Sequence, residues 1–133
     1  MSVPITAKKK ILIIEDDPFI VKMYRNKFED LGYIFRDAGD GEKGIAMAKE
    51  ERPDIMVLDI VLPHMDGFEI LKAIKKDKDL KDIPVMMLTN LGQRDEVEKG
   101  LSLGADDYLI KTHFTPSEVV EKVTAILKNK AKK

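Results

Sequence analysis

The sequence predicts an α/β protein with a parallel sheet that is covered by helices on both faces. Three observations support this prediction: short unbroken apolar runs, a stretch of helical spacing after each run, and no repeat or composition shift dividing the 133 residues. Unbroken apolar runs are typical of strands buried on both faces. Because crossovers between parallel strands are right-handed, five strand–helix units place helices on both faces of an open sheet.

Five runs are expected to form the strands. Three of them, residues 11–14, 55–58 and 85–88, consist of four consecutive apolar side chains. The shorter runs, 33–35 and 108–110, predict outer strands. In a sheet of this kind, a ligand crevice lies beyond the carboxyl ends of the strands.

One helix is expected after each strand. The first begins at Pro18, which suits a first helical turn, and Asp17 caps it. The last begins with the capping box TPSE at 115–118. The apolar stripes of the five helices are Ile20, Met23, Tyr24, Phe28 and Leu31; Ile45 and Ala48 within 41–51; Phe68, Leu71 and Ile74; Val97 and Leu101, ending near Gly104; and Val119, Val123, Ile126 and Leu127.

The composition excludes several classes of function. Without cysteine there is no disulfide, thiolate metal site or thiol catalysis. The longest apolar runs have about four residues, against the ~20 needed to span a bilayer. The N-terminus does not have the pattern of a signal peptide, so we expect no membrane association and a cytoplasmic protein.

Basic residues are concentrated at the two ends of the chain. We expect a basic leader at 1–9, one folded domain over 10–128 and a basic tail at 129–133. Residues 11–127 carry 16 basic and 24 acidic residues, a net charge of −8 that disfavours direct binding to DNA.

Polar side chains gather where the predicted strands end. Glu15 and Asp16 follow the first strand, Asp59 the third, Thr89 the fourth and Lys111 the fifth. Carboxylates this close repel one another unless a cation lies among them, and an oxygen-only ligand set suits Mg²⁺. An aspartate can accept a phosphoryl group, whose oxygens a lysine and a threonine can hold. The cluster predicts phosphoryl transfer to a carboxylate.

From about residue 10 to about residue 127, the chain resembles the receiver domains of two-component response regulators. The matching segments, in order, are the acidic group at 15–17, PDIMVLDIVLPHMDGFEIL at 53–71, PVMMLTN at 84–90 and GADDYLIK at 104–111. The resemblance implies a flavodoxin-like, doubly wound fold with five parallel strands in the order 2-1-3-4-5. It also implies a signalling protein of the stand-alone, chemotaxis type, which catalyses only its own phosphorylation and slow dephosphorylation.

The resemblance also assigns roles at the phosphorylation site. Asp59 would accept the phosphoryl group from a histidine kinase or a phosphotransfer protein. Asp16, Asp59 and the Val61 backbone carbonyl would bind Mg²⁺ directly, and Glu15 would act through a water molecule.

A second set of implied roles concerns the response. Lys111 would sense the phosphate, and Thr89 and Tyr108 would be the switch pair. The face formed by the fourth helix, fifth strand and fifth helix would then bind a partner protein or a second copy of the chain.

Three departures from the family pattern affect these expectations. Thr112 replaces the usual proline after Lys111, so we expect a trans peptide bond with a rearranged loop or a strained cis bond. Asn90 is larger than the usual residue and is expected to narrow access to the acceptor. Val61 and Leu91 flank the path of the hydrolytic water and cannot orient it, which predicts slow self-dephosphorylation.

Three other functions are consistent with parts of the pattern. A degenerate receiver that acts as a scaffold is disfavoured by the complete set of acidic residues, threonine and lysine. A Mg²⁺-dependent aspartyl phosphohydrolase needs a second carboxylate soon after the nucleophile, where Ile60 and Val61 stand. A flavin-binding protein of the same fold is disfavoured because EDDPF, at 15–19, would repel a phosphate.

Overall fold

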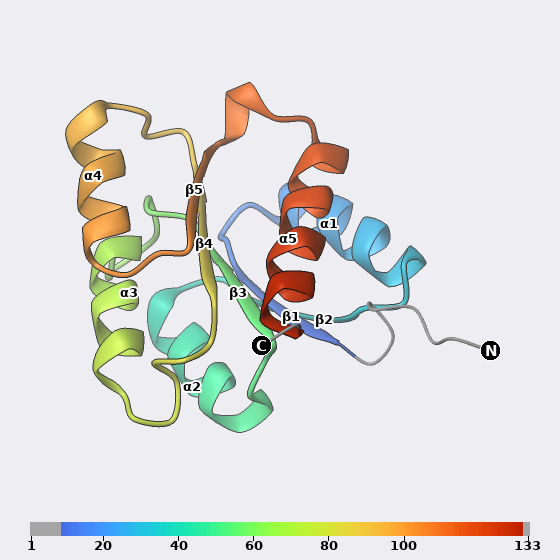
Figure 1. Ribbon diagram of the computed structural model, residues 1–133, viewed down its shortest axis with the longest axis horizontal. Helices are drawn as coiled ribbons and strands as arrows, with labels where there is room; N and C mark the ends of the chain where they lie inside the picture. Colours follow the sequence, from blue (N-terminus) through green and yellow to red (C-terminus); the bar gives the residue numbers. More distant parts are fainter. Residues whose placement is uncertain (1–8, 132–133) are drawn as a thin grey trace.

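The computed structural model describes residues 9–131, in which a five-stranded parallel sheet lies between two layers of helices (Figure 1). The strand order is β2-β1-β3-β4-β5, which confirms the predicted fold class and topology. The elements are β1 (Lys10–Ile14), α1 (Pro18–Asp30), β2 (Ile34–Ala38), α2 (Gly41–Glu51), β3 (Ile55–Leu58), α3 (Gly67–Lys76), β4 (Val85–Thr89), α4 (Arg94–Ser102), β5 (Asp107–Ile110), the short 3-10 turn η1 (Lys111–His113) and α5 (Pro116–Ala131).

The sheet has an apolar core on each face. Successive side chains of a strand point to opposite faces, so the fully buried strands contribute to both cores. Leu12 and Met56 pack with α2, α3 and α4, whereas Ile11 and Ile55 pack with α1 and α5. Figure 1 shows the same division, with α1 and α5 on one side of the sheet and α2, α3 and α4 on the other.

The predicted caps explain where the first and last helices begin. The Asp17 carboxylate accepts hydrogen bonds from the backbone N–H groups of Phe19 and Ile20, at 2.9 and 3.4 Å. At the start of α5, the Thr115 N–H donates to the Glu118 carboxylate at 2.9 Å, and the Glu118 N–H donates to the Thr115 hydroxyl at 3.2 Å. Both helices therefore begin where the sequence predicts.

The second strand begins later and extends further than the predicted 33–35. Tyr33 lies before β2, where its ring packs edge-on against Phe28 with the centroids 5.2 Å apart. Its hydroxyl shares a hydrogen bond with the Thr124 hydroxyl at 2.8 Å. The tyrosine therefore connects α1 to α5 instead of pairing in the sheet.

Two residues that the helical spacing assigned to the core are exposed. Leu31 is the C-cap of α1 and 49% exposed, and Leu101 in α4 is 47% exposed. Helical spacing identifies the inward face of a helix, but it does not show how far neighbouring elements cover that face.

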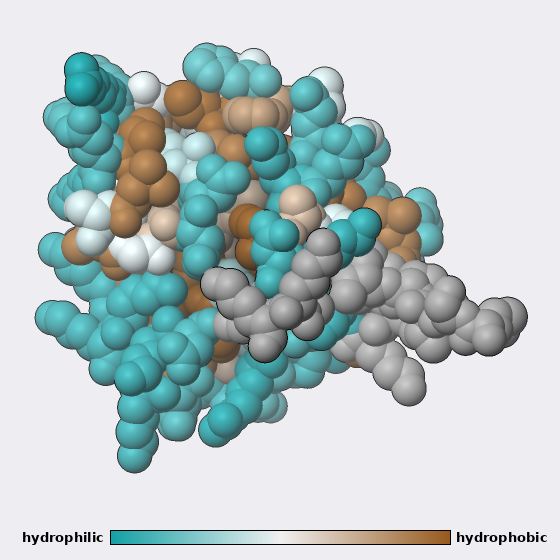
Figure 2. Space-filling model, in the orientation of Figure 1, coloured by the Kyte–Doolittle hydropathy of each residue, from teal (hydrophilic) through white to brown (hydrophobic). Residues whose placement is uncertain are grey.

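Residues 1–8 of the predicted basic leader and residues 132–133 of the predicted basic tail lie outside the described residues, whereas residues 129–131 belong to α5. Hydrophilic side chains cover most of the face drawn in Figure 2, with smaller apolar areas between them. Within residues 9–131, no helix combines the length and apolarity required to cross a membrane.

Candidate functional site

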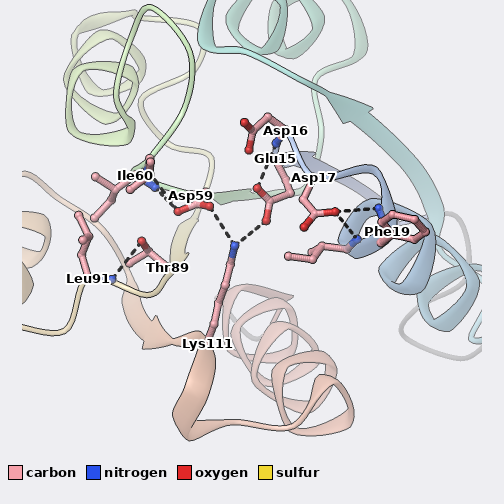
Figure 3. Close-up of polar contacts among 11 residues, drawn as sticks. Glu15, Asp16, Asp17, Phe19, Asp59, Ile60, Thr89, Leu91 and Lys111 are labelled. Carbon is pink, nitrogen blue, oxygen red and sulfur yellow. Dashed lines mark hydrogen bonds and ion pairs between the residues drawn. The ribbon is translucent and has the colours of Figure 1, made fainter.

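Three charged side chains meet at the carboxyl edge of the sheet (Figure 3). Glu15 follows β1, Asp59 follows β3 and Lys111 follows β5, so parallel pairing brings together residues that are far apart in the sequence. The Lys111 ammonium nitrogen lies 2.5 Å from Oε1 of Glu15 and 2.9 Å from Oδ2 of Asp59. One lysine therefore bridges two carboxylates.

The Asp59 carboxylate is held through both of its oxygens. Oδ1 accepts hydrogen bonds from the backbone N–H groups of Ile60 and Val61, at 2.7 and 3.3 Å. Oδ2 accepts from Lys111. The side chain is 10% exposed, so only a small part of the carboxylate is accessible to a reacting group.

The loop after Asp59 is fixed by a close backbone approach at Gly67, the first residue of α3. The Gly67 N–H donates to the Ile60 carbonyl at 2.9 Å. A Cβ atom at position 67 would lie 2.3 Å from the Asp59 carbonyl oxygen, well inside van der Waals contact. Asp66 caps α3 by accepting from the Glu69 N–H at 2.9 Å. Both residues therefore fix the shape of the loop between Asp59 and α3.

Burial and the contacts with Lys111 act in opposite directions on the pKa values of the cluster. Burial raises the pKa of Glu15; the Lys111 hydrogen bond opposes this rise, and the charge of Asp59 adds to it. For Lys111, burial lowers the pKa, but the hydrogen bonds and charges of both carboxylates outweigh burial and raise the pKa above its ordinary value. Lys111 therefore stays protonated and compensates the repulsion between the carboxylates.

The two predicted switch residues contact the same loop residue. Thr89 is fully buried, and its hydroxyl accepts a hydrogen bond from the Leu91 N–H at 3.4 Å. The Tyr108 hydroxyl donates to the Leu91 carbonyl at 2.6 Å, and its side chain faces inward, with Tyr108 only 8% exposed. Sequence reasoning missed the part played by Leu91, because a contact made by backbone atoms leaves no residue-type signal.

The family model for the response regulator receiver domain matches residues 11–124. The chain belongs to this family. Solved structures agree in fold. The chemotaxis response regulator CheY4 of Vibrio cholerae is 29% identical with a TM-score of 0.83, over 90% of this chain and 99% of that one. The receiver domain of the Francisella response regulator 1452 is 30% identical with a TM-score of 0.85, over 92% and 99%.

Curated relatives are longer proteins. The DNA-binding dual master transcriptional regulator RpaA of Synechocystis is 43% identical over 119 residues, which are 90% of this chain and 49% of that protein. The alkaline phosphatase synthesis transcriptional regulatory protein PhoP of Bacillus subtilis is 41% identical over 120 residues, 90% of this chain and 49% of that protein. The chain therefore spans about half the length of these relatives.

Asp16, the remaining acidic residue expected at the metal site of this receiver, is exposed. Its backbone N–H donates to Oε2 of Glu15 at 3.0 Å, and in Figure 3 the Lys111 contacts reach Glu15 and Asp59 but not Asp16. Within residues 9–131, no three acidic or histidine side chains converge as a preformed metal site. The donor atoms are all oxygens, which fits Mg²⁺, an ion that binds through one or two carboxylates and keeps its waters.

The departures from the family pattern follow the ends of β3, β4 and β5. No peptide bond within residues 9–131 is cis, so the bond before Thr112 is trans, and residues Lys111–His113 form the turn η1. Asn90 is exposed. Val61 is 62% exposed and its backbone N–H donates to Asp59, while Leu91 is partly buried and its N–H donates to Thr89.

Proposed function

We propose that this receiver accepts a phosphoryl group on Asp59 from a phosphohistidine of a histidine kinase or phosphotransfer protein. The observation that carries the proposal is the geometry of the Asp59 carboxylate: it lies at the carboxyl edge of the sheet, backbone N–H groups hold Oδ1, and the Lys111 ammonium lies 2.9 Å from Oδ2. A carboxylate held in this way is positioned for attack on phosphorus.

The proposed reaction forms one bond and breaks another. An Asp59 oxygen attacks the phosphorus atom of the donor, the P–N bond breaks, and the imidazole leaves with the bonding electron pair and takes up a proton. Lys111 and the Thr89 hydroxyl would hold phosphoryl oxygens, and the lysine would offset part of the charge that the added phosphate brings.

Asp16, Asp59 and the backbone carbonyl of Val61 would hold Mg²⁺ directly, with Glu15 acting through a water molecule. The bound ion would offset negative charge on the transferring phosphoryl group. The Lys111 ammonium already pairs with both Glu15 and Asp59 in this structure and offsets one of their two negative charges. Because both carboxylates are engaged, a site that binds the metal through them requires Lys111 to give up part of its contact.

The proposed response is a population shift at the switch residues. Phosphate on Asp59 would draw the Thr89 hydroxyl toward it and away from the Leu91 N–H, and the β4–α4 loop would follow. Tyr108 contacts the same loop, because its hydroxyl donates a hydrogen bond to the Leu91 carbonyl. The changed face of α4, β5 and α5 would bind a partner protein or a second copy of the chain.

We propose that output from residues 11–127 passes through protein contacts and not through DNA. Their net charge of −8 repels a polyanion. The regulators RpaA and PhoP, each about twice as long, are named as transcriptional regulators, and RpaA as DNA-binding. In RpaA, direct binding to DNA would thus belong to the part of that protein outside the stretch that matches this chain.

Beryllofluoride, which mimics a phosphoryl group, tests the acceptor. We expect it to bind in the presence of Mg²⁺, to lose binding when Mg²⁺ is chelated, and to lose binding in Asp59→Asn. Asp79→Asn is the matched control, because it removes the same charge at an exposed position in the loop between α3 and β4. Equal binding by wild type and Asp59→Asn would reject Asp59 as the acceptor.

Slow self-dephosphorylation is a separate part of the proposal. Val61 and Leu91 offer no hydrogen bond to a hydrolytic water, so the phosphorylated protein should decay slowly. The double variant Val61→Asn/Leu91→Glu supplies polar groups at both positions and should shorten the half-life of the acyl phosphate, measured after labelling with radioactive phosphate. A half-life equal to that of wild type would show that these side chains do not control hydrolysis.

A further inference from the structure

Tyr108 packs against a helix position that has no side chain. Gly100 lies in the last turn of α4 and is itself buried. A Cβ atom at position 100 would lie 2.8 Å from Cδ2 and 3.0 Å from Cε2 of Tyr108, and 3.7 Å from Cε1 of Phe68. Carbon atoms are attracted at about 3.5–4.0 Å. The Phe68 distance is thus an ordinary contact, whereas the two Tyr108 distances require something to move.

The glycine is not explained by backbone conformation. The positive φ angles among the described residues belong to Gly32, Gly104, Arg52 and His64, not to Gly100. In a helix interior, glycine is less favourable than alanine by about 1 kcal/mol. Gly100 weakens the helix and is not needed for a turn. Its presence is explained by the space that it leaves for the Tyr108 ring.

Helix α4 is held in place from several sides, so the ring is the part that can give way. The Lys99 ammonium lies 4.6 Å from the centroid of the Phe68 ring on α3. At the start of α4, the Gln93 N–H donates to the Glu96 carboxylate at 3.0 Å within a capping box. Val97 also packs against the core. Tyr108 itself belongs to the same core, and its hydroxyl is held by the hydrogen bond to the Leu91 carbonyl.

We propose that Gly100 is a positioning residue of the switch. Because it has no side chain, it leaves room for the Tyr108 ring to lie inward, where the Tyr108 hydroxyl reaches the Leu91 carbonyl. This inference deepens the proposed function, on which it rests for the role of Tyr108. A larger residue at position 100 would move the ring outward and break the hydroxyl bond. The residue at position 100 would thereby set the fraction of unphosphorylated molecules in which the Tyr108 ring lies inward.

The position of the ring can be measured without any phosphoryl mimic. The chain has three tyrosines, so protein labelled with 3-fluorotyrosine should give three ¹⁹F resonances, and Tyr108→Phe assigns one of them. In wild type, the Tyr108 resonance should be protected from a soluble paramagnetic relaxation agent. In Gly100→Ala, its relaxation should increase several-fold while Tyr24 and Tyr33 stay protected. Ser102→Ala, a change at an exposed position of the same helix, should leave all three unchanged.

A double-mutant cycle tests the same contact through folding. In the wild-type background, Gly100→Ala should lower the folding equilibrium constant, because the added Cβ meets the ring. In a Tyr108→Ala background, the same change should raise that constant by about fivefold, the ordinary advantage of alanine over glycine in a helix. We therefore expect the effect of Gly100→Ala on the folding equilibrium constant to have opposite signs in the two backgrounds. This difference remains measurable if Gly100→Ala alone is poorly folded.

The outcomes separate this inference from the proposed function. The role of Gly100 would be overturned if the Tyr108 resonance stayed protected in Gly100→Ala. It would also be overturned if Gly100→Ala changed the folding equilibrium constant in the same direction in both backgrounds. Both conclusions hold whether or not beryllofluoride binds. Beryllofluoride with Mg²⁺ should still bind to Gly100→Ala, because Asp59 and Lys111 are unchanged, but higher concentrations should be needed to protect Tyr108. Failure of wild type to bind beryllofluoride would instead contradict the proposed acceptor.

Discussion

Replacing Lys111 by methionine would test what compensates the buried charges of the site. Methionine keeps most of the volume of the lysine chain but lacks its charge. The change leaves Glu15 and Asp59 facing each other, with side chains only 3% and 10% exposed. Each carboxylate loses a hydrogen bond, at 2.5 and 2.9 Å respectively, and the protein has to bury two negative charges with no cation between them.

The size of the effect follows from the burial of the three groups. Removing one partner of a buried ion pair costs about 3–5 kcal/mol of unfolding free energy. Because the Lys111 side chain is 17% exposed, water can replace part of its contribution, and we expect about 3 kcal/mol. With a urea m-value of about 1.5–2 kcal/mol/M for a chain of this size, the unfolding midpoint should fall by about 1.5–2 M.

Urea unfolding followed by far-ultraviolet circular dichroism measures this midpoint without a tryptophan, which the chain lacks. The matched control is the triple variant Glu15→Gln/Asp59→Asn/Lys111→Met, which removes all three charges and should recover most of the loss. A midpoint for Lys111→Met within about 0.3 M of wild type would refute the reasoning, because it would show that solvent already screens the carboxylates.

Three further predictions concern the framework of the site. Gly67→Ala places a Cβ 2.3 Å from the Asp59 carbonyl oxygen, so thermal unfolding should show a loss of at least about 1–3 kcal/mol and beryllofluoride should bind more weakly; an unchanged melting temperature would mean that the loop can shift freely. Leu80→Ala, at a fully buried position, should lower the unfolding free energy by about 2–5 kcal/mol in urea, and a loss below about 1 kcal/mol would contradict its place in the core. The hydrogen bond from the Thr115 N–H lowers the pKa of Glu118 below 4.5; its stabilisation is therefore present above 4.5 and is lost as the pH falls through the lowered value. The stability advantage of wild type over Glu118→Gln should accordingly shrink in acid, and an advantage independent of pH would rule out this origin.

Much of the fold could be predicted because local signals and burial agree. The unbroken apolar runs at 11–14, 55–58 and 85–88 could be satisfied only by strands covered on both faces. The caps at Asp17 and Thr115 satisfy N–H groups that the helix itself cannot pair, so they mark the helix starts from sequence alone. Both signals act over a few residues, which is why the sequence displays them directly.

Other features depended on packing between distant segments. Tyr33 was expected in a strand, but contacts with Phe28 and Thr124 place it before β2. Leu31 and Leu101 lie on the expected helix faces and are still about half exposed, so the surrounding elements cover these two positions only in part. The position of Tyr33 and the exposure of the two leucines depend on the length and placement of other elements. The spacing of apolar residues within one helix carries no information about those elements.

The sequence by itself determined that acidic, hydroxyl and ammonium groups would stand at the carboxyl ends of the strands, since local patterns mark the strand ends and parallel strands bring those ends to one edge of the sheet. The order of the strands was implied by the resemblance to receiver domains. Only the tertiary structure decided that Lys111 bridges Glu15 and Asp59 while Asp16 remains exposed. It also decided that Tyr108 lies inward against Gly100. The physical reason is that charge pairing and ring packing act over a few ångströms between residues far apart in the chain, so their partners are settled only when the sheet and helices are in place.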